Sequence, residues 1–148
     1  MTDLRPLSPA EAAQGLRRAG DAARGFLGTD PVTQNDALLA RELTRREAQV
    51  YAAGGALVGC VPNRAQPRQA YVSSTSAGPE PVRALLGHLT TYQRRTSFVA
   101  LVPADSTGAA AAFLGAGFAH SGVLPGHHYA GHAFHDLLVL VKEEPCRS

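Results

Sequence analysis

Four histidines crowd into one short stretch near the end of this 148-residue chain. They are His127, His128, His132 and His135, and Asp136 follows the last of them. Imidazole is a common metal ligand, and the imidazole of histidine also moves protons near neutral pH. The cluster therefore indicates either a metal site or proton-transfer catalysis, and the element that carries it decides between them.

The histidines fall on two strand-like runs, residues 120–129 and 132–141, with an Ala-Gly turn between them. A two-residue turn there would pair Tyr129 with His132 and would divide the histidines between the two faces of a hairpin. Neither face then gathers three histidines close together, so we expect no metal site. The proton-transfer candidates on this hairpin are His127, His128 and Tyr129.

A second set of polar residues lies on a β-prone run, residues 70–74. Its hydroxyls belong to Tyr71, Ser73 and Ser74, and no base adjoins them, so we expect hydrogen bonding to a ligand rather than nucleophilic attack. Asp30 stands before a proline near the start of a predicted helix, where it is either a substrate-binding residue or a turn residue.

The middle of the chain predicts a strand–helix–strand–helix unit. After the run at 70–74, residues 82–95 carry the apolar spacing of one helix face, 97–103 are nearly all apolar, and 108–115 predict a second helix. A strand, a crossover helix and a second strand place two parallel strands side by side. Ligands commonly bind such sheets at the loop after the first strand.

The flanking segments predict an otherwise antiparallel sheet. Ser8 begins a capping box that starts the first helix, and residues 33–48 predict a second helix. Two β-prone runs, 49–53 and 56–61, are joined by a glycine pair, which is typical of a hairpin. The run Leu137–Val141 is apolar throughout, as expected of a central strand covered on both faces.

Composition narrows the classes of partner. A hydrophobic content of 45% and a formal charge of +2 suit one globular domain spanning residues 1–148 and do not indicate a nucleic-acid partner. No apolar run approaches the roughly 20 residues of a membrane span, and the N-terminus lacks the apolar core of a signal peptide. We therefore expect a cytoplasmic protein with no membrane partner. Cys60 and Cys146 have no CxxC neighbour and are expected to be inert.

The order of these elements resembles the GNAT superfamily of acyl-CoA N-acyltransferases. The matching segments are LRPLSPAEA, VYAAGGALVGCV, VPADSTGAAAAFLGAGF and YAGHAFHDLLVLV. The resemblance implies an α/β (α+β) fold: a single GNAT-like domain whose mixed, mostly antiparallel sheet has six or seven strands and a parallel central pair. It also implies that this sheet is splayed between Tyr71 and Phe98, with helices on both faces.

The same resemblance implies a function, which is transfer of an acyl group from acetyl-CoA or another acyl-CoA to the amine of a small molecule, with a homodimer as a possible assembly. His127 or His128 on the hairpin would deprotonate the acceptor, and Tyr129 or water would supply the proton for the leaving thiolate. The residues expected to bind the cofactor are Ser73, Ser74, Gly78, Arg83 and Ser106. Those expected to bind the substrate are Asp30, Tyr71 and Phe113.

The loop that would hold the CoA pyrophosphate departs from the family pattern. Ala77 occupies the basic position, and Glu80 and Val82 stand where glycines belong. Pro79 and Pro81 each lack an N–H donor. We therefore expect weak CoA binding, although Arg83 from the first helical turn could offset the charge of Glu80. A well-capped helix start is the simpler interpretation of the Pro-Glu-Pro segment.

Two further positions depart from the pattern. Phe113 falls where the family commonly has a proton-donating tyrosine, and Ser106 falls where it often has asparagine. Three functions stay open: acyl transfer to a small amine, a relative that has lost acyl-CoA and performs other proton-transfer chemistry in the same cleft, and a noncatalytic binding protein.

Overall fold

A single seven-stranded sheet runs through the computed structural model, which describes residues 3–31, 33–130 and 133–144. The strand order is β1-β2-β3-β4-β5-β7-β6, and every neighbouring pair is antiparallel except β4 and β5. The strands are β1 (Leu4–Leu7), β2 (Gln49–Ala53), β3 (Ala56–Pro62), β4 (Gln69–Ser74), β5 (Ser97–Pro103), β6 (Ala119–Ala130) and β7 (Ala133–Glu143). The expected mixed sheet with one parallel pair is confirmed.

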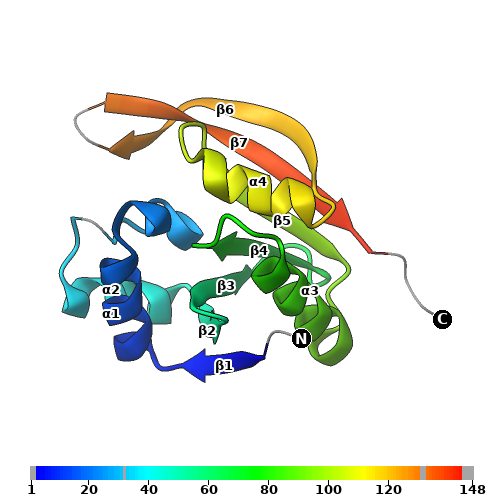
Figure 1. The fold of residues 1–148 in the computed structure, drawn as a ribbon, viewed down its shortest axis with the longest axis horizontal. Helices are drawn as coiled ribbons and strands as arrows, with labels where there is room; N and C mark the ends of the chain where they lie inside the picture. Colours follow the sequence, from blue (N-terminus) through cyan, green and yellow to red (C-terminus); the bar gives the residue numbers. More distant parts are fainter. Residues whose placement is uncertain (1–2, 32, 131–132, 145–148) are drawn as a thin grey trace.

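Helices cover both faces of this sheet (Figure 1). They are α1 (Pro9–Ala19), the short 3₁₀ turns η1 (Gly20–Ala23) and η2 (Phe26–Gly28), α2 (Asp36–Arg45), α3 (Glu80–Gln93) and α4 (Thr107–Gly115). The helices α1 and α2 pack on each other and on one face, whereas α3 and α4 cover the other. None of the helices in the described ranges is long and apolar enough to cross a membrane.

Two hydrophobic clusters form the core, one on each face of the sheet. The larger cluster joins α3 and α4 to the strands through side chains such as Leu89, Phe98 and Phe113. The smaller cluster joins α1 and α2 to β2 through Leu16, Leu39 and Val50. Because strand side chains alternate, β2 contributes to both clusters, with Val50 on one face and Tyr51 on the other.

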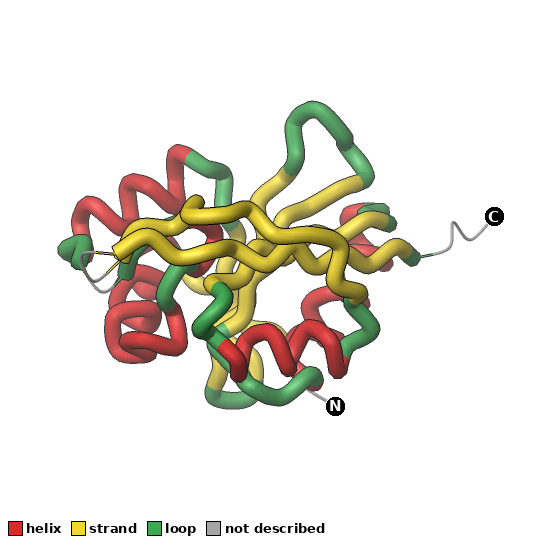
Figure 2. Tube along the Cα trace, turned by 90° about the horizontal axis from the view of Figure 1, so that it is seen from above, coloured by secondary structure: helices red, strands yellow, loops and turns green. Residues whose placement is uncertain are grey.

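The two parallel strands separate after a short stretch of pairing. β4 and β5 pair only at Gln69–Ser97, Ala70–Phe98 and Tyr71–Val99. Beyond that register the strands diverge, so the sheet is split between an N-terminal part and the β5-β7-β6 part that Figure 2 shows from above. The expected splay is confirmed, and it opens a gap beside Ser73 and Ser74.

The helix starts follow local chemistry, with one correction. Ser8 accepts a hydrogen bond from the Glu11 amide while the Glu11 carboxylate accepts one from the Ser8 amide, so the expected capping box is confirmed. Asn35 caps α2, which is shorter than expected. The expectation of a well-capped start for α3 is wrong, because its N-cap is Pro79, which makes no side-chain capping bond.

The expected register of the last hairpin is also wrong. Tyr129 pairs with Phe134, and His128 pairs with His135, two positions further along β7 than expected. A register shift between Leu124 and His128 accommodates the extra residues of β6, and there the Gly126 amide donates to Asp136 Oδ1 at 2.8 Å. Gly131 and His132, where the turn was expected, lie outside the described residues.

The strand β7 lies inside the sheet, between β5 and β6, as expected of a central strand. Its burial is less complete than the apolar run predicts. Leu137 and Leu140 are buried, but Leu138, Val139 and Val141 are only half-buried. One face of this part of the sheet is therefore only partly covered, because α1 and α2 pack on β2 and β3 rather than on β7.

Candidate active site

The segment between α1 and α2 crosses the splayed sheet and forms one wall of the site. Phe26 is buried, and its ring lies so close to Gly59 of β3 that a side chain at position 59 would meet it at 3.0 Å. Leu27 has a left-handed backbone (φ 49°, ψ 33°), which is costly for a residue other than glycine. The Leu27 amide donates to Ser73 Oγ at 2.9 Å, which ties this strained turn to β4.

A narrow slot lies where β4 and β5 diverge. Its volume is about 20 Å³, enough for about one water molecule. Four of the residues expected to bind cofactor or substrate line it together: Ser73, Ser74, Ser106 and Phe113. Because the sheet splays here, residues from β4 and from α4 and its N-cap come together at one place.

A larger cavity of about 250 Å³ lies on the other side of the same opening. It is lined by Leu27, Gly28, Arg46, Val61, Pro62, Tyr71, Val72, Ser73 and Leu101. Tyr71, expected to bind substrate, is placed here and is partly exposed. Ser73 and Leu101 line both the slot and the larger cavity. Two ligands that entered from opposite sides would thus meet at these two residues.

A charged cluster adjoins the slot through Arg24, which lines it. Arg24 Nη2 lies 2.5 Å from Asp105 Oδ1, and His135 Nδ1 lies 4.0 Å from Asp105 Oδ2. Arg24 comes from the α1–α2 segment, Asp105 from the loop after β5 and His135 from β7. The Arg24 Nε is buried and lacks a hydrogen-bond partner among the described residues. A carboxylate beside an imidazole is the arrangement that orients a general base.

Burial raises the pKa of Asp105, but the hydrogen bond and charge of Arg24 outweigh it, so the pKa lies below its usual value. Asp105 is therefore ionised at neutral pH. A depressed carboxyl pKa contributes stability above the unfolded-state pKa, and that contribution is lost as the pH falls through the folded-state pKa.

We expect Asp105→Asn to lower the midpoint of urea unfolding at pH 7, because it removes this ionised partner of Arg24. The difference from the wild type should shrink as the pH falls below about 3.9, the usual pKa of an aspartate. Urea titrations at both pH values check this, and Asp36→Asn, which leaves Arg17 unpaired on an exposed surface, is the control. A difference that stays constant with pH would contradict the ionised bridge.

The loop before α3 directs its amides inward. The Ser76 amide donates to Ser74 Oγ at 3.1 Å, and the Gly78 amide donates to Ser76 Oγ at 3.0 Å. Pro79 and Pro81 have no N–H to offer. The Glu80 carboxylate lies close enough to Gly78 that a side chain at position 78 would meet its Oε2 at 3.5 Å.

The helix α4 packs directly on this loop. A side chain at Gly108 would meet Ala77 Cβ at 3.4 Å, and one at Gly115 would meet Pro79 Cβ at 3.2 Å. Arg83 pairs with Glu80, as expected, with its Nη1 3.5 Å from Glu80 Oε1, and its Nη2 donates to the Gly115 carbonyl at 2.7 Å. A pyrophosphate is bound by free amides and a nearby cation. Here the Ser76 and Gly78 amides and the Arg83 guanidinium already have partners within the protein.

The hairpin residues expected to act as catalysts are only partly placed. His127 is exposed and lies within the irregular stretch of β6. His128 is the backbone partner of His135, and Tyr129 is the partner of Phe134. Their side chains lie outside the described structure. His135 belongs to the histidine cluster but was not among the expected catalysts, and its Nδ1 lies 4.0 Å from the Asp105 carboxylate. Nothing in the sequence indicated Asp105 as its partner.

Phe113 is fully buried, and its ring packs edge to face on Phe118 with centroids 5.0 Å apart. It lines the slot with Ser106, whose side chain makes no capping bond to α4. The aromatic ring therefore closes the inner end of the slot without any group that could donate a proton.

For the acyl transfer that the family resemblance implies, we expect Phe113→Tyr to leave the rate unchanged or raised, because the added hydroxyl would enter the slot beside Ser106. Phe118→Tyr, which adds a hydroxyl to the neighbouring ring outside the slot, is the control and should not raise the rate. Steady-state rates of both variants check this. A large loss in Phe113→Tyr with an intact circular dichroism spectrum would mean that Phe113 shapes the pocket instead.

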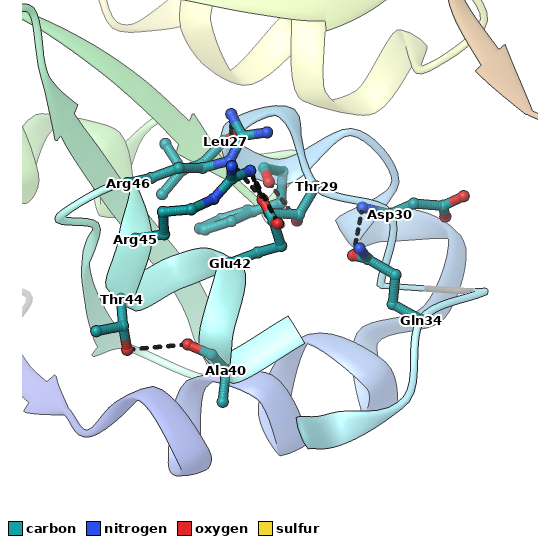
Figure 3. A network of polar contacts seen from close by, with 10 residues as sticks. Leu27, Thr29, Asp30, Gln34, Ala40, Glu42, Thr44, Arg45 and Arg46 are labelled. Carbon is teal, nitrogen blue, oxygen red and sulfur yellow. Dashed lines mark hydrogen bonds and ion pairs between the residues drawn. The ribbon is translucent and has the colours of Figure 1, made fainter. Parts of the chain in front are cut away.

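Asp30 has a local role in the α1–α2 segment. Its amide donates to Gln34 Oε1 at 3.2 Å (Figure 3). Its Oδ2 accepts from Thr33 Oγ1 at 2.6 Å. These bonds form a turn before α2, and the residue does not line the slot or the larger cavity. The turn interpretation of Asp30 therefore agrees with its contacts.

Several solved structures with this architecture are acetyltransferases. RimL, a ribosomal L7/L12 alpha-N-protein acetyltransferase in complex with coenzyme A, superposes with a TM-score of 0.71 at 14% identity, over 97% of this chain and 94% of its own. A chimera of spermidine N-acetyltransferase SpeG from Vibrio cholerae and hSSAT gives 0.72 at 12% identity, over 96% and 95%. The chain has the GNAT fold.

A third GNAT structure is the microcin C7 self-immunity acetyltransferase MccE in complex with acetyl-CoA and AMP. Its TM-score is 0.64 at 16% identity, over 96% of this chain and 92% of that one. No protein-family model matches the chain, and no curated protein is similar enough in sequence to count as a relative. The likeness to GNAT structures is therefore one of fold.

Proposed function

We propose that the chain is an N-acyltransferase that moves an acyl group from a thioester donor, such as acetyl-CoA, to the amine of a small molecule. The observation that carries this proposal is the meeting of two cavities at Ser73 and Leu101, at the splay of a GNAT sheet. The slot would receive the thioester, and the larger cavity would receive the amine. Transfer forms a C–N bond and breaks the C–S bond of the donor.

His135 is the base that this proposal favours. The acceptor must lose a proton to attack, and the ionised Asp105 carboxylate lies 4.0 Å from His135 Nδ1, a charge contact longer than a hydrogen bond. Asp105 in turn is bonded to Arg24, which lines the slot. His128, the backbone partner of His135, is the second candidate, and Tyr129 stays a proposed proton donor to the thiolate.

The donor would be held mainly by its acyl end. The slot has room for about one water, so it would have to widen to admit a pantetheine arm. The loop at residues 76–82 offers few free hydrogen-bond donors to the nucleotide end of CoA, since two of its amides donate to serine oxygens. The same loop favours a second candidate function, in which a GNAT-fold enzyme without acyl-CoA performs other proton-transfer chemistry on a small metabolite in this cleft.

Blocking the junction of the cavities tests the proposal. Purified protein is incubated with acetyl-CoA and a pool of small primary amines, and N-acetylated products are detected by mass spectrometry. Leu101→Trp, which fills the junction, should lower product formation at least about 10²-fold, as small misplacements of substrates do. Leu114→Trp, on an exposed position of α4, is the matched control and should be silent. Equal product from both variants would place the reaction elsewhere.

A further inference from the structure

The larger cavity combines apolar walls with one charged group. Leu27, Val61, Pro62, Val72 and Leu101 supply its apolar walls, and Arg46 at the end of α2 supplies the charge. The volume of about 250 Å³ lies just below the roughly 300–1,000 Å³ of pockets for drug-sized ligands. The cavity therefore suits a small molecule with an apolar body and one anionic group.

The charge of Arg46 is only partly neutralised (Figure 3). Glu42 accepts hydrogen bonds from Arg45 Nη2 at 2.9 and 2.7 Å, and it lies 3.4 Å from Arg46 Nε. One carboxylate thus serves two guanidinium groups. The hydrogen bond from Arg45 holds the pKa of Glu42 below its usual value, so Glu42 carries one full negative charge. One positive charge remains without a counter-charge, and it belongs to the more weakly bonded Arg46.

Some N–H donors of Arg46 make no hydrogen bond to the described residues. Its Nη1 donates to the Leu27 carbonyl at a long 3.4 Å, and its Nη2 has no hydrogen-bond partner among the described residues. Ser73 and Tyr71 line the same cavity, and each hydroxyl can donate a hydrogen bond. Ser73 Oγ already accepts from Leu27, which leaves its own O–H as the donor. A planar guanidinium with a free edge matches a carboxylate.

Leu27 fixes the distance between these groups. Its carbonyl accepts from Arg46 at 3.4 Å and its amide donates to Ser73 at 2.9 Å. A single residue spans at most about 3.6 Å, so Arg46 Nη1 and Ser73 Oγ lie within roughly 10 Å of each other. Ser73 also lines the slot, where the thioester of the proposed reaction would lie. A molecule only as long as an amino acid can therefore reach from Arg46 to Ser73.

We infer that the acceptor is a small amino acid with an apolar side chain, whose carboxylate binds Arg46 and whose amine points to Ser73. This inference rests on the proposed acyl transfer and names its acceptor. The apolar walls would hold the side chain, and the uncompensated charge would favour a carboxylate over a neutral amide. The same charge would repel a polyamine, whose ammonium groups would lie close to a guanidinium in a partly dry cavity.

Direct binding tests the carboxylate site without any acyl donor. Isothermal titration compares L-leucine, 3-methylbutanoate and L-leucinamide on the full chain. We expect leucine and 3-methylbutanoate to bind about 10- to 100-fold more tightly than leucinamide, as a hydrogen bond to a charged group implies. Arg46→Gln should remove this preference and Arg46→Lys should keep part of it. Arg45→Gln is the matched control, since Arg45 pairs with the same Glu42 but does not line the cavity.

The outcomes separate this inference from the proposed function. Equal binding of leucine and leucinamide, or a preference that survives Arg46→Gln in a folded variant, would overturn the carboxylate site. A transfer assay with the same two amines reports on the reaction. If both amines are acylated equally, the function holds and the inference fails. If neither is acylated but the Arg46-dependent preference is present, the site holds and the function fails.

Discussion

Replacing His135 by glutamine (His135→Gln) is expected to lower the acyl-transfer rate on the order of 10²–10⁴-fold, the usual contribution of a positioned general base. Glutamine keeps much of the size and the polarity of histidine but does not take up a proton from the acceptor ammonium. The measurement is kcat/KM for acceptor amine with the donor in excess. The cost should fall as the pH rises, because a growing share of the amine then arrives already neutral.

The other hairpin histidines provide graded controls. His127→Gln should be nearly silent, because His127 is exposed and lies in the irregular stretch of β6. His128→Gln should have a smaller effect than His135→Gln, since His128 is the backbone partner of His135 rather than a neighbour of Asp105. If His135→Gln keeps full activity with an intact fold, His135 is not the base. A large loss in His127→Gln would instead indicate the exposed His127 as the base.

The second large effect concerns CoA itself. We expect a dissociation constant for acetyl-CoA above the roughly μM–mM range of ordinary enzyme substrates. The amides of Ser76 and Gly78 already donate to serine oxygens, and Arg83 is bonded to Gly115 and paired with Glu80. The Glu80 carboxylate would face a pyrophosphate, and like charges about 4 Å apart repel by about 1 kcal/mol in water and more when partly desolvated.

Glu80→Gln should therefore tighten CoA binding by about 5- to 10-fold, which corresponds to about 1 kcal/mol of removed repulsion. Glu47→Gln removes the same charge from an exposed pair with Arg64 and is the control for net charge. Isothermal titration calorimetry measures all three proteins. A tight wild-type complex, with Glu80→Gln no tighter, would mean that the loop rearranges to accept the phosphates.

Much of the fold could be predicted from the sequence because its signals are local. The glycine pair between β2 and β3, the capping box at Ser8 and the apolar run of β5 each specify an element without reference to the rest of the chain. The order of those elements then leaves few topologies, among them the one observed. The register of the last hairpin failed because the shift after Leu124 depends on contacts such as that between Gly126 and Asp136.

The site could be predicted less completely, for a physical reason. The sequence could predict four residues that line the slot, because they lie on elements whose positions the fold determines: Ser73, Ser74, Ser106 and Phe113. Arg24 and Asp105 are far apart in sequence, and their pairing depends on how the sheet splays. Arg46 gave no signal either, since an arginine at the end of a helix is usually a solvated residue that favours the helix dipole. The carboxylate-binding role that we propose for Arg46 depends on the cavity, which forms only by tertiary packing.

The most direct test of acyl transfer by this chain is a comparison of two donors, acetyl-CoA and S-acetyl-N-acetylcysteamine, which carries the same thioester without phosphates or nucleotide. We expect acetyl transfer from both donors, with kcat/KM values within about 10-fold of each other, because the loop before α3 would make few contacts with the nucleotide. A preference for acetyl-CoA of about 10³-fold or more would contradict the account of the loop. Absence of acetylated product with either donor, in a protein that is folded, would contradict acyl transfer itself.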